Sequence, residues 1–331
     1  MSHISRRGLL AGGAAVGTFA ATASLAQPDQ IAADLDLQGK NILVTGCSSG
    51  FGRLMAEDFA RKGATVFATM RNMPRPEAEE LETLAETEGL DLHVIEIDVM
   101  SDEQVSSGVA KAEEIAGGAI DVLINNAGIG YAGPIELQDM QATQLIFDTN
   151  VYGPHRMSRA ALPAMRRAKS GLIFNISSQL GRVIVPSAGH YSPTKFALEA
   201  MSEAMAYELV PHGVEVCVIE PGGYPTKVWV NRNRLANELK ERLNFDERAA
   251  YPQLVARMGE EDGTRRTADP MDVPNAIAEI IAMPPGTRPL RKAVHPGNKP
   301  QVPINELTAK VQVDWLGQSG FGPWIKDVHN V

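Results

Sequence analysis

Residues 45 to 52 read Thr-Gly-Cys-Ser-Ser-Gly-Phe-Gly and lie between an apolar run at 41–45 and a segment with helical spacing at 51–62. Glycine permits a tight turn and a close approach of the backbone to a ligand. The N–H groups at the start of the following helix favour a negatively charged group such as a pyrophosphate. A strand, a glycine-rich turn and a helix in this order predict the first unit of a dinucleotide-binding sheet.

The same alternation of strand-like and helix-like segments continues along the chain. Short β-branched runs are separated by stretches with helical spacing, which predicts right-handed βαβ units. We therefore expect a single α/β domain with a Rossmann-type, doubly wound parallel sheet and helices on both faces. The further expected strands are 64–70, 92–98, 120–125, 172–177, 214–220 and 290–294, and the further helices lie near 77–88, 102–116, 140–165 and 192–210.

The first 26 residues have the composition of an export signal. Arg6 and Arg7 precede a weakly apolar, Ala/Gly-rich run, and small residues end it at Ser24 and Ala26. This order resembles a twin-arginine signal peptide at 1–26, and it predicts cleavage after Ala26 and a periplasmic mature protein. The alternative is an alanine-rich N-terminal arm with two incidental arginines, in which case we expect a cytoplasmic protein.

The folded domain is expected at 36–296, followed by a Pro-rich tail at 297–331. Within the domain, the polar segment 227–267 breaks the alternation, so we expect one or two helices there, inserted as a lid beside the ligand. Its basic run at 231–234, Asn-Arg-Asn-Arg, is interpreted as a solvated helix face, with the basic edge of a lid as the alternative. The tail is aromatic, and it would close the pocket or pack on a partner subunit.

The composition limits the classes of function. The formal net charge of -9 over 331 residues argues against nucleic acid as a partner. No apolar run beyond the N-terminal segment is long enough to cross a membrane. Cys47 and Cys217 are the only cysteines, and without a Cys/His cluster we expect no metal site. The expected topology does not place their strands side by side, so we expect two shielded thiols rather than a disulfide.

Further motifs follow the expected strands or open the next helices. Ligands of doubly wound sheets bind outside the carboxyl ends of the strands, so residues at these positions are expected to meet at one edge of the sheet. The motifs are Asn-Asn-Ala-Gly at 125–128, Asn150, Ser178, the YxxxK pair Tyr191 and Lys195, and Pro221, Gly222 and Thr226.

Together with the turn at 45–52, these motifs resemble the main branch of the short-chain dehydrogenase/reductase family over residues 36–296. The resemblance implies an oxidoreductase that transfers a hydride between a nicotinamide cofactor and a carbonyl or secondary alcohol. It assigns catalytic roles to Asn150, Ser178, Tyr191 and Lys195. The residues implied to bind the cofactor are Gly46, Ser48, Ser49, Gly50, Phe51, Gly52, Arg71, Asp98, Val99, Asn126, Ala127, Gly128, Tyr191, Lys195, Pro221, Gly222 and Thr226.

The chemistry of the YxxxK pair fits this role. Tyr191 and Lys195 are four residues apart and share one face of a helix. An ammonium close to a phenol is expected to lower the phenol's pKa from about 10 toward working pH. Tyr191 would then give a proton to a carbonyl oxygen, or take one from an alcohol, and Ser178 would stabilise the charge on that oxygen. By the resemblance, Lys195 also holds the nicotinamide ribose, and Asn150 orders water leading to Lys195.

The end of the second expected strand predicts the cofactor. Enzymes that use NAD usually carry an acidic residue there, about twenty residues past the glycine turn. This chain has Met70 at that place, and Arg71 follows it. Because a guanidinium pairs well with a phosphate, we expect NADP(H) to be favoured over NAD(H). The alternative is that Arg71 only stacks on the adenine.

The resemblance also extends to substrate and assembly. The turn at 45–52 and the run Ala-Thr-Met-Arg at 68–71 are similar to those of family members that act on hydrophobic carbonyls. Family members usually associate through the helices that here carry Asn150 and Tyr191, so a homodimer or homotetramer is expected. Two other readings remain open: a catalytically silent, redox-sensing nucleotide-binding protein, and an epimerase or dehydratase of the family's longer-chain branch.

Overall fold

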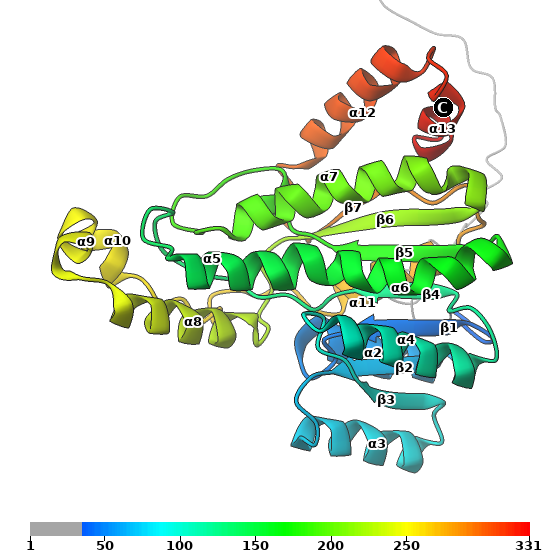
Figure 1. Ribbon diagram of the computed structural model, residues 1–331, viewed down its shortest axis with the longest axis horizontal. Coiled ribbons are helices and arrows are strands. Elements are labelled where there is room, and N and C mark those ends of the chain that lie inside the picture. The colour runs from blue at the N-terminus through cyan, green and yellow to red at the C-terminus, as the bar shows by residue number, and fades with distance from the viewer. Residues whose placement is uncertain (1–34) are drawn as a thin grey trace, which may run out of the picture.

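Seven parallel strands form the centre of the molecule, in the order β3-β2-β1-β4-β5-β6-β7 (Figure 1). The computed structural model describes residues 35–331, so the expected signal at 1–26 lies outside the described residues. The change of direction in strand order falls between β1 and β4, as in a doubly wound sheet. The strands are β1 (Asn41–Thr45), β2 (Thr65–Met70), β3 (Leu92–Glu96), β4 (Val122–Asn125), β5 (Gly171–Ile176), β6 (Val214–Pro221) and β7 (Arg291–Val294).

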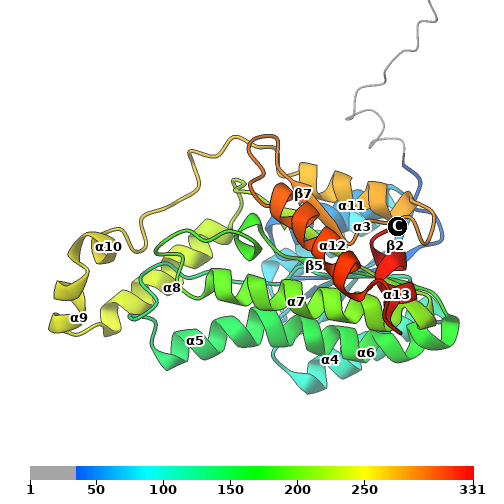
Figure 2. The ribbon, with the colours of Figure 1, turned by 90° about the horizontal axis from the view of Figure 1, so that it is seen from above.

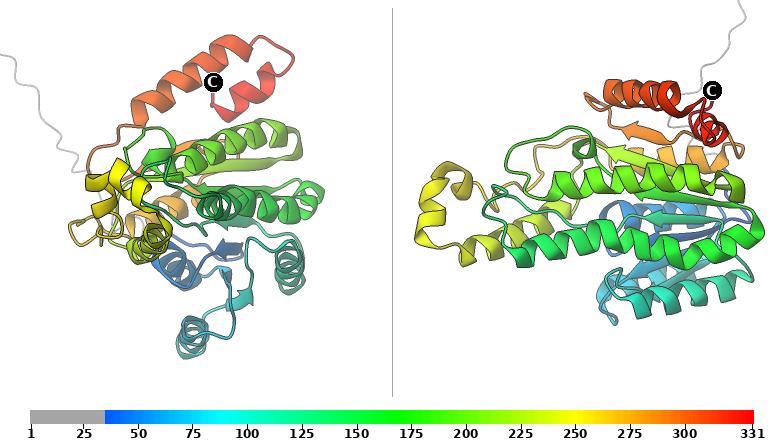
Figure 3. Two further views of the ribbon diagram at one scale, coloured as in Figure 1. Left: turned by 60° about the vertical axis from the view of Figure 1, so that its left-hand side comes forward. Right: turned by 45° about the horizontal axis from the view of Figure 1, so that its top comes forward.

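Helices cover both faces of the sheet (Figure 3). Side chains alternate along a strand, so Ile42 and Val44 of β1 pack on one face while Leu43 packs on the other. The first face is covered by α2 (Gly50–Arg61), α3 (Pro76–Glu88) and α11 (Asp272–Ala282), and the second by α4 (Asp102–Ala116), α6 (Gly153–Ala168) and α7 (Tyr191–Leu209). The single α/β domain predicted from the sequence is confirmed.

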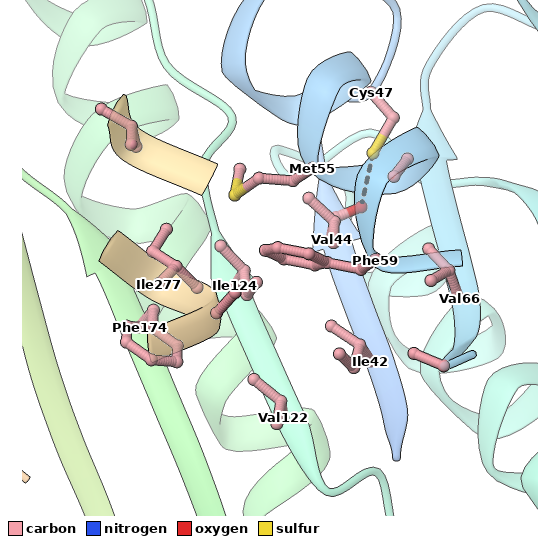
Figure 4. Packing of buried hydrophobic residues seen from close by; sticks show 14 of the residues in the cluster. Ile42, Val44, Cys47, Met55, Phe59, Val66, Val122, Ile124, Phe174 and Ile277 are labelled. Carbon is pink, nitrogen blue, oxygen red and sulfur yellow. Dashed lines mark hydrogen bonds between the residues drawn. The ribbon is translucent and has the colours of Figure 1, made fainter. Parts of the chain in front are cut away.

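The packing under α2 shows how the first βαβ unit is held. Met55 and Phe59 of α2 are fully buried and lie over Ile42, Val44 and Ile124 of the two central strands (Figure 4). A fully buried side chain of this size contributes about 1.5–3 kcal/mol relative to an exposed one. Because this packing holds α2 against β1 and β4, it also fixes the position of the glycine-rich turn that joins β1 to α2.

Both cysteines are shielded, as expected. Cys47 follows β1 and Cys217 lies in β6, and both thiols are free and buried. Burial raises the pKa of the Cys47 thiol to about 12, and the Cys47 Sγ donates to the carbonyl oxygen of Val44 at 3.2 Å (Figure 4). Residues 35–331 contain neither a His/Cys/Asp/Glu group suited to a metal ion nor a helix long and apolar enough to span a membrane.

The segment 227–267 is more helical than expected. It forms α8 (Val228–Arg242), α9 (Phe245–Ala250) and α10 (Pro252–Ala256), so the prediction of one or two helices is wrong. A capping box at Asn244 and Glu247 starts α9, and proline at the first position starts α10. These helices extend beyond one end of the sheet, beside the connection that follows β4 (Figure 2).

The tail at 297–331 also forms helices, α12 (Val302–Leu316) and α13 (Gly322–Val328) (Figure 1). The α13 helix packs on α7, its Ile325 is buried, and His329 Nε2 lies 2.7 Å from the hydroxyl of Tyr207 of α7. The C-terminal tail thus covers part of α7, the helix that carries Tyr191. The homodimer or homotetramer through the helices of Asn150 and Tyr191 stays a prediction.

Candidate active site

The turn between β1 and α2 needs its glycines for space and for backbone conformation. Gly46 has a φ of +77°, and a Cβ there would lie 2.9 Å from the Cα of Ala127. A Cβ on Gly52 would lie 2.4 Å from the carbonyl oxygen of Gly46. Ser49 makes no side-chain cap at the start of α2, so it does not occupy the N–H groups there. This helix start can therefore receive an anion.

The Asn-Asn-Ala-Gly motif holds this turn against β4. The backbone N–H groups of Asn126 and Ala127 donate to the Thr45 Oγ1 at 2.9 and 3.0 Å. The side-chain amide of Asn126 donates to the Thr45 carbonyl oxygen at 2.8 Å. These bonds tie the carboxyl ends of β1 and β4 together. The motif therefore steadies the centre of the sheet.

A cavity of about 930 Å³ runs along the carboxyl ends of the strands. Its volume is at the upper end of the range typical of ligand sites, as a dinucleotide together with a substrate requires. Every residue expected to bind the cofactor lines this cavity except Gly52, which lies beneath the turn. The lining includes Gly46, Ser48, Ser49, Gly50, Phe51, Arg71, Asp98, Val99, Asn126, Ala127, Gly128, Ser178, Tyr191, Lys195, Pro221, Gly222 and Thr226.

Asn150 lies behind the cavity wall. It belongs to a single π-helical turn, Asp148–Tyr152, that joins α5 (Met140–Phe147) to α6. Its side-chain amide donates to the Ile129 carbonyl oxygen and its Oδ1 accepts from the Ile129 N–H, both at 2.8 Å. The same amide donates to Thr194 Oγ1 of α7 at 3.1 Å. In this geometry Asn150 fixes the segment after Gly128 and its spacing from the helix of Tyr191.

Ser178, Tyr191 and Lys195 meet on one side of the cavity. Ser178 follows β5 and lies close enough to Tyr191 to lower the pKa of its hydroxyl, while the Ser178 Oγ accepts from the Leu180 N–H at 3.1 Å. Lys195 is buried, and its Nζ donates to the Ile176 carbonyl oxygen at 2.8 Å. The same Nζ lies 5.6 Å from the centre of the Tyr191 ring. The predicted convergence of these three side chains is present in the structure.

The pKa values of Tyr191 and Lys195 differ from what the sequence predicted. Burial raises the pKa of Tyr191 above its ordinary value, although the Ser178 hydrogen bond and the charge of Arg232 act to lower it. Burial also lowers the pKa of Lys195 to about 8, against the opposing effect of Glu199. The net direction for Tyr191 in the chain alone is therefore opposite to the predicted lowering, because burial disfavours the phenolate more than Ser178 and Arg232 favour it.

Two arginines at the cavity were not expected there. Arg232 of α8 is partly buried beside Tyr131, and Arg266 stacks on Trp229 with 4.3 Å between its Cζ and the ring centre. The solvated-face interpretation is wrong for Arg232, whereas Arg234 is exposed and pairs with Glu238. The helical spacing of the sequence could have indicated that Arg232 faces inward. Position 232 precedes the buried positions 235, 236 and 239 by three, four and seven residues, so it lies on the same face of the helix. Nothing in the sequence pattern singled out Arg266.

The fold and this cavity define a class of protein. It is a doubly wound domain in which Ser178, Tyr191 and Lys195 lie close together in the cavity that begins at the glycine-rich turn. The chain matches the model of the short chain dehydrogenase family over residues 40–236. It belongs to the short chain dehydrogenase family, and it is an NAD(P)-dependent oxidoreductase that acts on CH–OH groups.

Curated relatives cover most of the chain. The chain is 34% identical to the mitochondrial D-beta-hydroxybutyrate dehydrogenase of Mus musculus over 274 residues, which is 76% of each protein. It is 38% identical to retinol dehydrogenase 8 of Homo sapiens over 262 residues, which is 76% of this chain and 79% of that protein.

Solved structures agree with this assignment. A short-chain dehydrogenase from Streptomyces avermitilis is 31% identical, with a TM-score of 0.64 over 82% of this chain and 92% of its own. A gluconate 5-dehydrogenase from Burkholderia cenocepacia in complex with NADP and tartrate is 26% identical, with a TM-score of 0.55 over 64% of this chain and 83% of its own. A 3-ketoacyl-(acyl-carrier-protein) reductase from Brucella melitensis complexed with NADH is also 26% identical, with a TM-score of 0.60 over 75% and 92%.

Proposed function

We propose that this enzyme transfers a hydride between NADP(H) and a carbonyl or secondary alcohol, with Tyr191 as the general acid and base. The observation that carries the proposal is the convergence of Ser178, Tyr191 and Lys195 on a cavity that begins at the glycine-rich turn. The redox-sensing alternative has less support, because the loss of any of these three side chains would have favoured it and all are present.

The cavity fits a nicotinamide dinucleotide. The start of α2 and the turn at Gly46 would hold the pyrophosphate, because their N–H groups face a cavity wall without side-chain caps. Asp98 and Val99 would contact the adenine, and Lys195 the ribose near the reacting end, as the family resemblance implies. When bound, the cofactor supplies or accepts the hydride.

The side chains of this chain would manage the proton. In carbonyl reduction the Tyr191 hydroxyl gives its proton to the carbonyl oxygen while Ser178 donates a hydrogen bond to the same oxygen. In alcohol oxidation the direction reverses, and Tyr191 takes the hydroxyl proton. The Lys195 ammonium lies close to the Tyr191 ring, and its positive charge would oppose the effect of burial on the Tyr191 hydroxyl. Asn150 keeps the helix of Tyr191 at its distance from the Gly128 segment.

The direct test is turnover. The purified enzyme should oxidise NADPH in the presence of some members of a panel of ketones, and the alcohol products should be found by mass spectrometry. The cavity wall also includes Tyr131, Leu254 and Met258, which supports substrates with an apolar part. Binding of NADPH without turnover of any ketone or alcohol in the panel would favour the redox-sensing alternative.

The preference for NADP(H) is proposed to rest on Arg71. Its side chain is 42% exposed at the cavity, and its nearest carboxylate oxygen, on Asp98, is 3.9 Å away. A guanidinium so loosely paired is available to a 2′-phosphate, and a charge-assisted hydrogen bond is worth about 1.5–3 kcal/mol. Arg71→Ala should therefore weaken NADP(H) binding by roughly 10- to 100-fold and leave NAD(H) binding nearly unchanged.

Fluorescence titration of both cofactors measures this preference. Arg61→Ala is the matched control, because Arg61 is ion-paired on the surface at the far end of α2. Equal weakening of both cofactors by Arg71→Ala would instead indicate that Arg71 stacks on the adenine.

We also propose export by the twin-arginine route, supported by Arg6, Arg7 and the small residues before position 27. In a bacterial host, the wild-type chain should be recovered from the periplasm with its N-terminus at Gln27. Replacing Arg6 and Arg7 together by lysine should retain the full-length chain in the cytoplasm. The same cytoplasmic, uncleaved product from both chains would show that 1–26 is only an N-terminal arm.

A further inference from the structure

A positively charged side chain lies next to the expected proton donor. Arg232 and Tyr191 approach the same point beside Gly130, where an added Cβ would lie 3.6 Å from Arg232 Cδ and 3.7 Å from Tyr191 Cδ2. The Arg232 Nε donates to the Tyr131 carbonyl oxygen at 3.4 Å, which directs the guanidinium along the cavity. Arg232 therefore lies beside Tyr191 in the cavity, next to the side chain that would exchange a proton with the substrate.

A second guanidinium is held on the same aromatic ring. The Trp229 indole N–H donates to the Tyr224 carbonyl oxygen at 2.7 Å, which fixes the ring beside the end of β6. The Cζ of Arg266 lies 4.3 Å from the centre of this ring, and that of Arg232 lies 5.4 Å from it. Arginine stacked on tryptophan keeps its donors free at the edges of the guanidinium plane. Arg232 and Arg266 are thus both held against the Trp229 ring, and both line the same cavity.

Neither cation has a carboxylate partner within residues 35–331. All ion pairs within 4.0 Å in this range involve other residues, and the Nε of Arg266 is buried without a hydrogen-bond acceptor. Glu261 lines the same cavity and opposes the lowering of the Arg232 pKa that burial causes, but it does not close an ion pair. Desolvated cations without partners are unfavourable, so this arrangement calls for an anion from outside the chain.

We propose that the substrate is an oxo acid or hydroxy acid whose carboxylate binds Arg232, with Arg266 adding positive charge beside it. This inference rests on the proposed hydride transfer and names the class of its substrate. A planar guanidinium matches a carboxylate with two parallel hydrogen bonds. Because Arg232 adjoins Tyr191, the carboxylate lies only a few bonds from the reacting carbon, and the apolar wall at Leu254 and Met258 takes the rest of the molecule.

The test compares acids with their neutral esters. The probes are acetoacetate and levulinate, each paired with its methyl ester, and kcat/KM is measured with NADPH for all four. In the wild-type enzyme at least one acid should be preferred to its ester. In Arg232→Met the ratio of the two kcat/KM values should fall by roughly 100-fold, because the charge-assisted hydrogen bonds are lost for the acid alone. The ratio cancels any effect of the substitution on Tyr191, which acts on both probes.

Arg234→Met is the matched control, because Arg234 lies on the same helix but pairs with Glu238 at the surface. Its ratio should equal that of the wild type, and Arg232→Lys should restore part of the preference. An unchanged ratio in Arg232→Met would overturn the proposal. So would a loss of NADPH affinity in that variant with the acid preference intact, since Arg232 would then serve the cofactor.

The failure of the substrate proposal differs from failure of the proposed function. If wild-type enzyme reduces neutral ketones or esters but shows no preference for either acid, the hydride transfer stands and the carboxylate site is wrong. If it reduces no member of the acid, ester and ketone panels while binding NADPH, the proposed function itself fails, and the substrate class fails with it.

Discussion

Tyr191→Phe is expected to lower kcat/KM by about 1,000-fold or more while NADPH binds with nearly unchanged Kd. The substitution removes only the hydroxyl that gives or takes the proton, and a positioned general acid contributes roughly 100- to 10,000-fold. The ring stays in place between Ser178 and Lys195, so the cavity keeps its shape. Steady-state rates with the best ketone, together with a fluorescence titration of NADPH, measure both quantities.

Tyr207→Phe provides the control for this prediction. Tyr207 lies on the same helix, but its hydroxyl contacts Glu203 and His329 away from the cavity. Its removal should change stability slightly and turnover hardly at all. If Tyr191→Phe also turned over at a normal rate, another group would have to donate the proton, and the mechanism above would be wrong.

The parts of the site that the sequence predicted well are those in which local geometry demands one residue type. The glycines of 46–52 are such a case, because a Cβ at Gly46 or Gly52 would meet backbone atoms. Since strand order then brings the carboxyl ends of β1, β4, β5 and β6 to one edge, the motifs that follow them converge. Residues at Ser178 and Tyr191 could be placed together on this basis alone.

The parts that the sequence predicted poorly depend on packing between distant segments. Arg232 reaches the cavity only because Leu235, Ala236 and Leu239 pack α8 against the segment after β4. The sequence does not say which neighbour an amphipathic helix will find. The same limit applies to α11, which was not expected, and to the pKa of Tyr191, which depends on burial by several elements.

The buried lysine gives a second large effect, on stability rather than turnover. Burial lowers the Lys195 pKa in the folded chain from 10.5 to about 8. Below pH 8 both the folded and unfolded states are protonated, and the full cost of burying the charge is present. Between pH 8 and 10.5 the unfolded state binds more protons, so this cost declines as the pH rises. In cofactor-free protein, the wild type should therefore gain stability relative to Lys195→Met as the pH is raised.

The gain between pH 7 and pH 10 should be about 2–3 kcal/mol, because each unit of pKa shift corresponds to about 1.4 kcal/mol. Denaturant unfolding of the wild type and of Lys195→Met across this range measures the gain. Subtracting the two unfolding free energies at each pH cancels the contributions of the titrating groups that both chains share. Lys310→Met is the control, because Lys310 is 70% exposed on α12 and its ammonium is not buried by folding. A flat difference for Lys195→Met would mean that the ammonium is not held at a burial cost. The enzyme would then lack the desolvated charge that we propose to act on Tyr191.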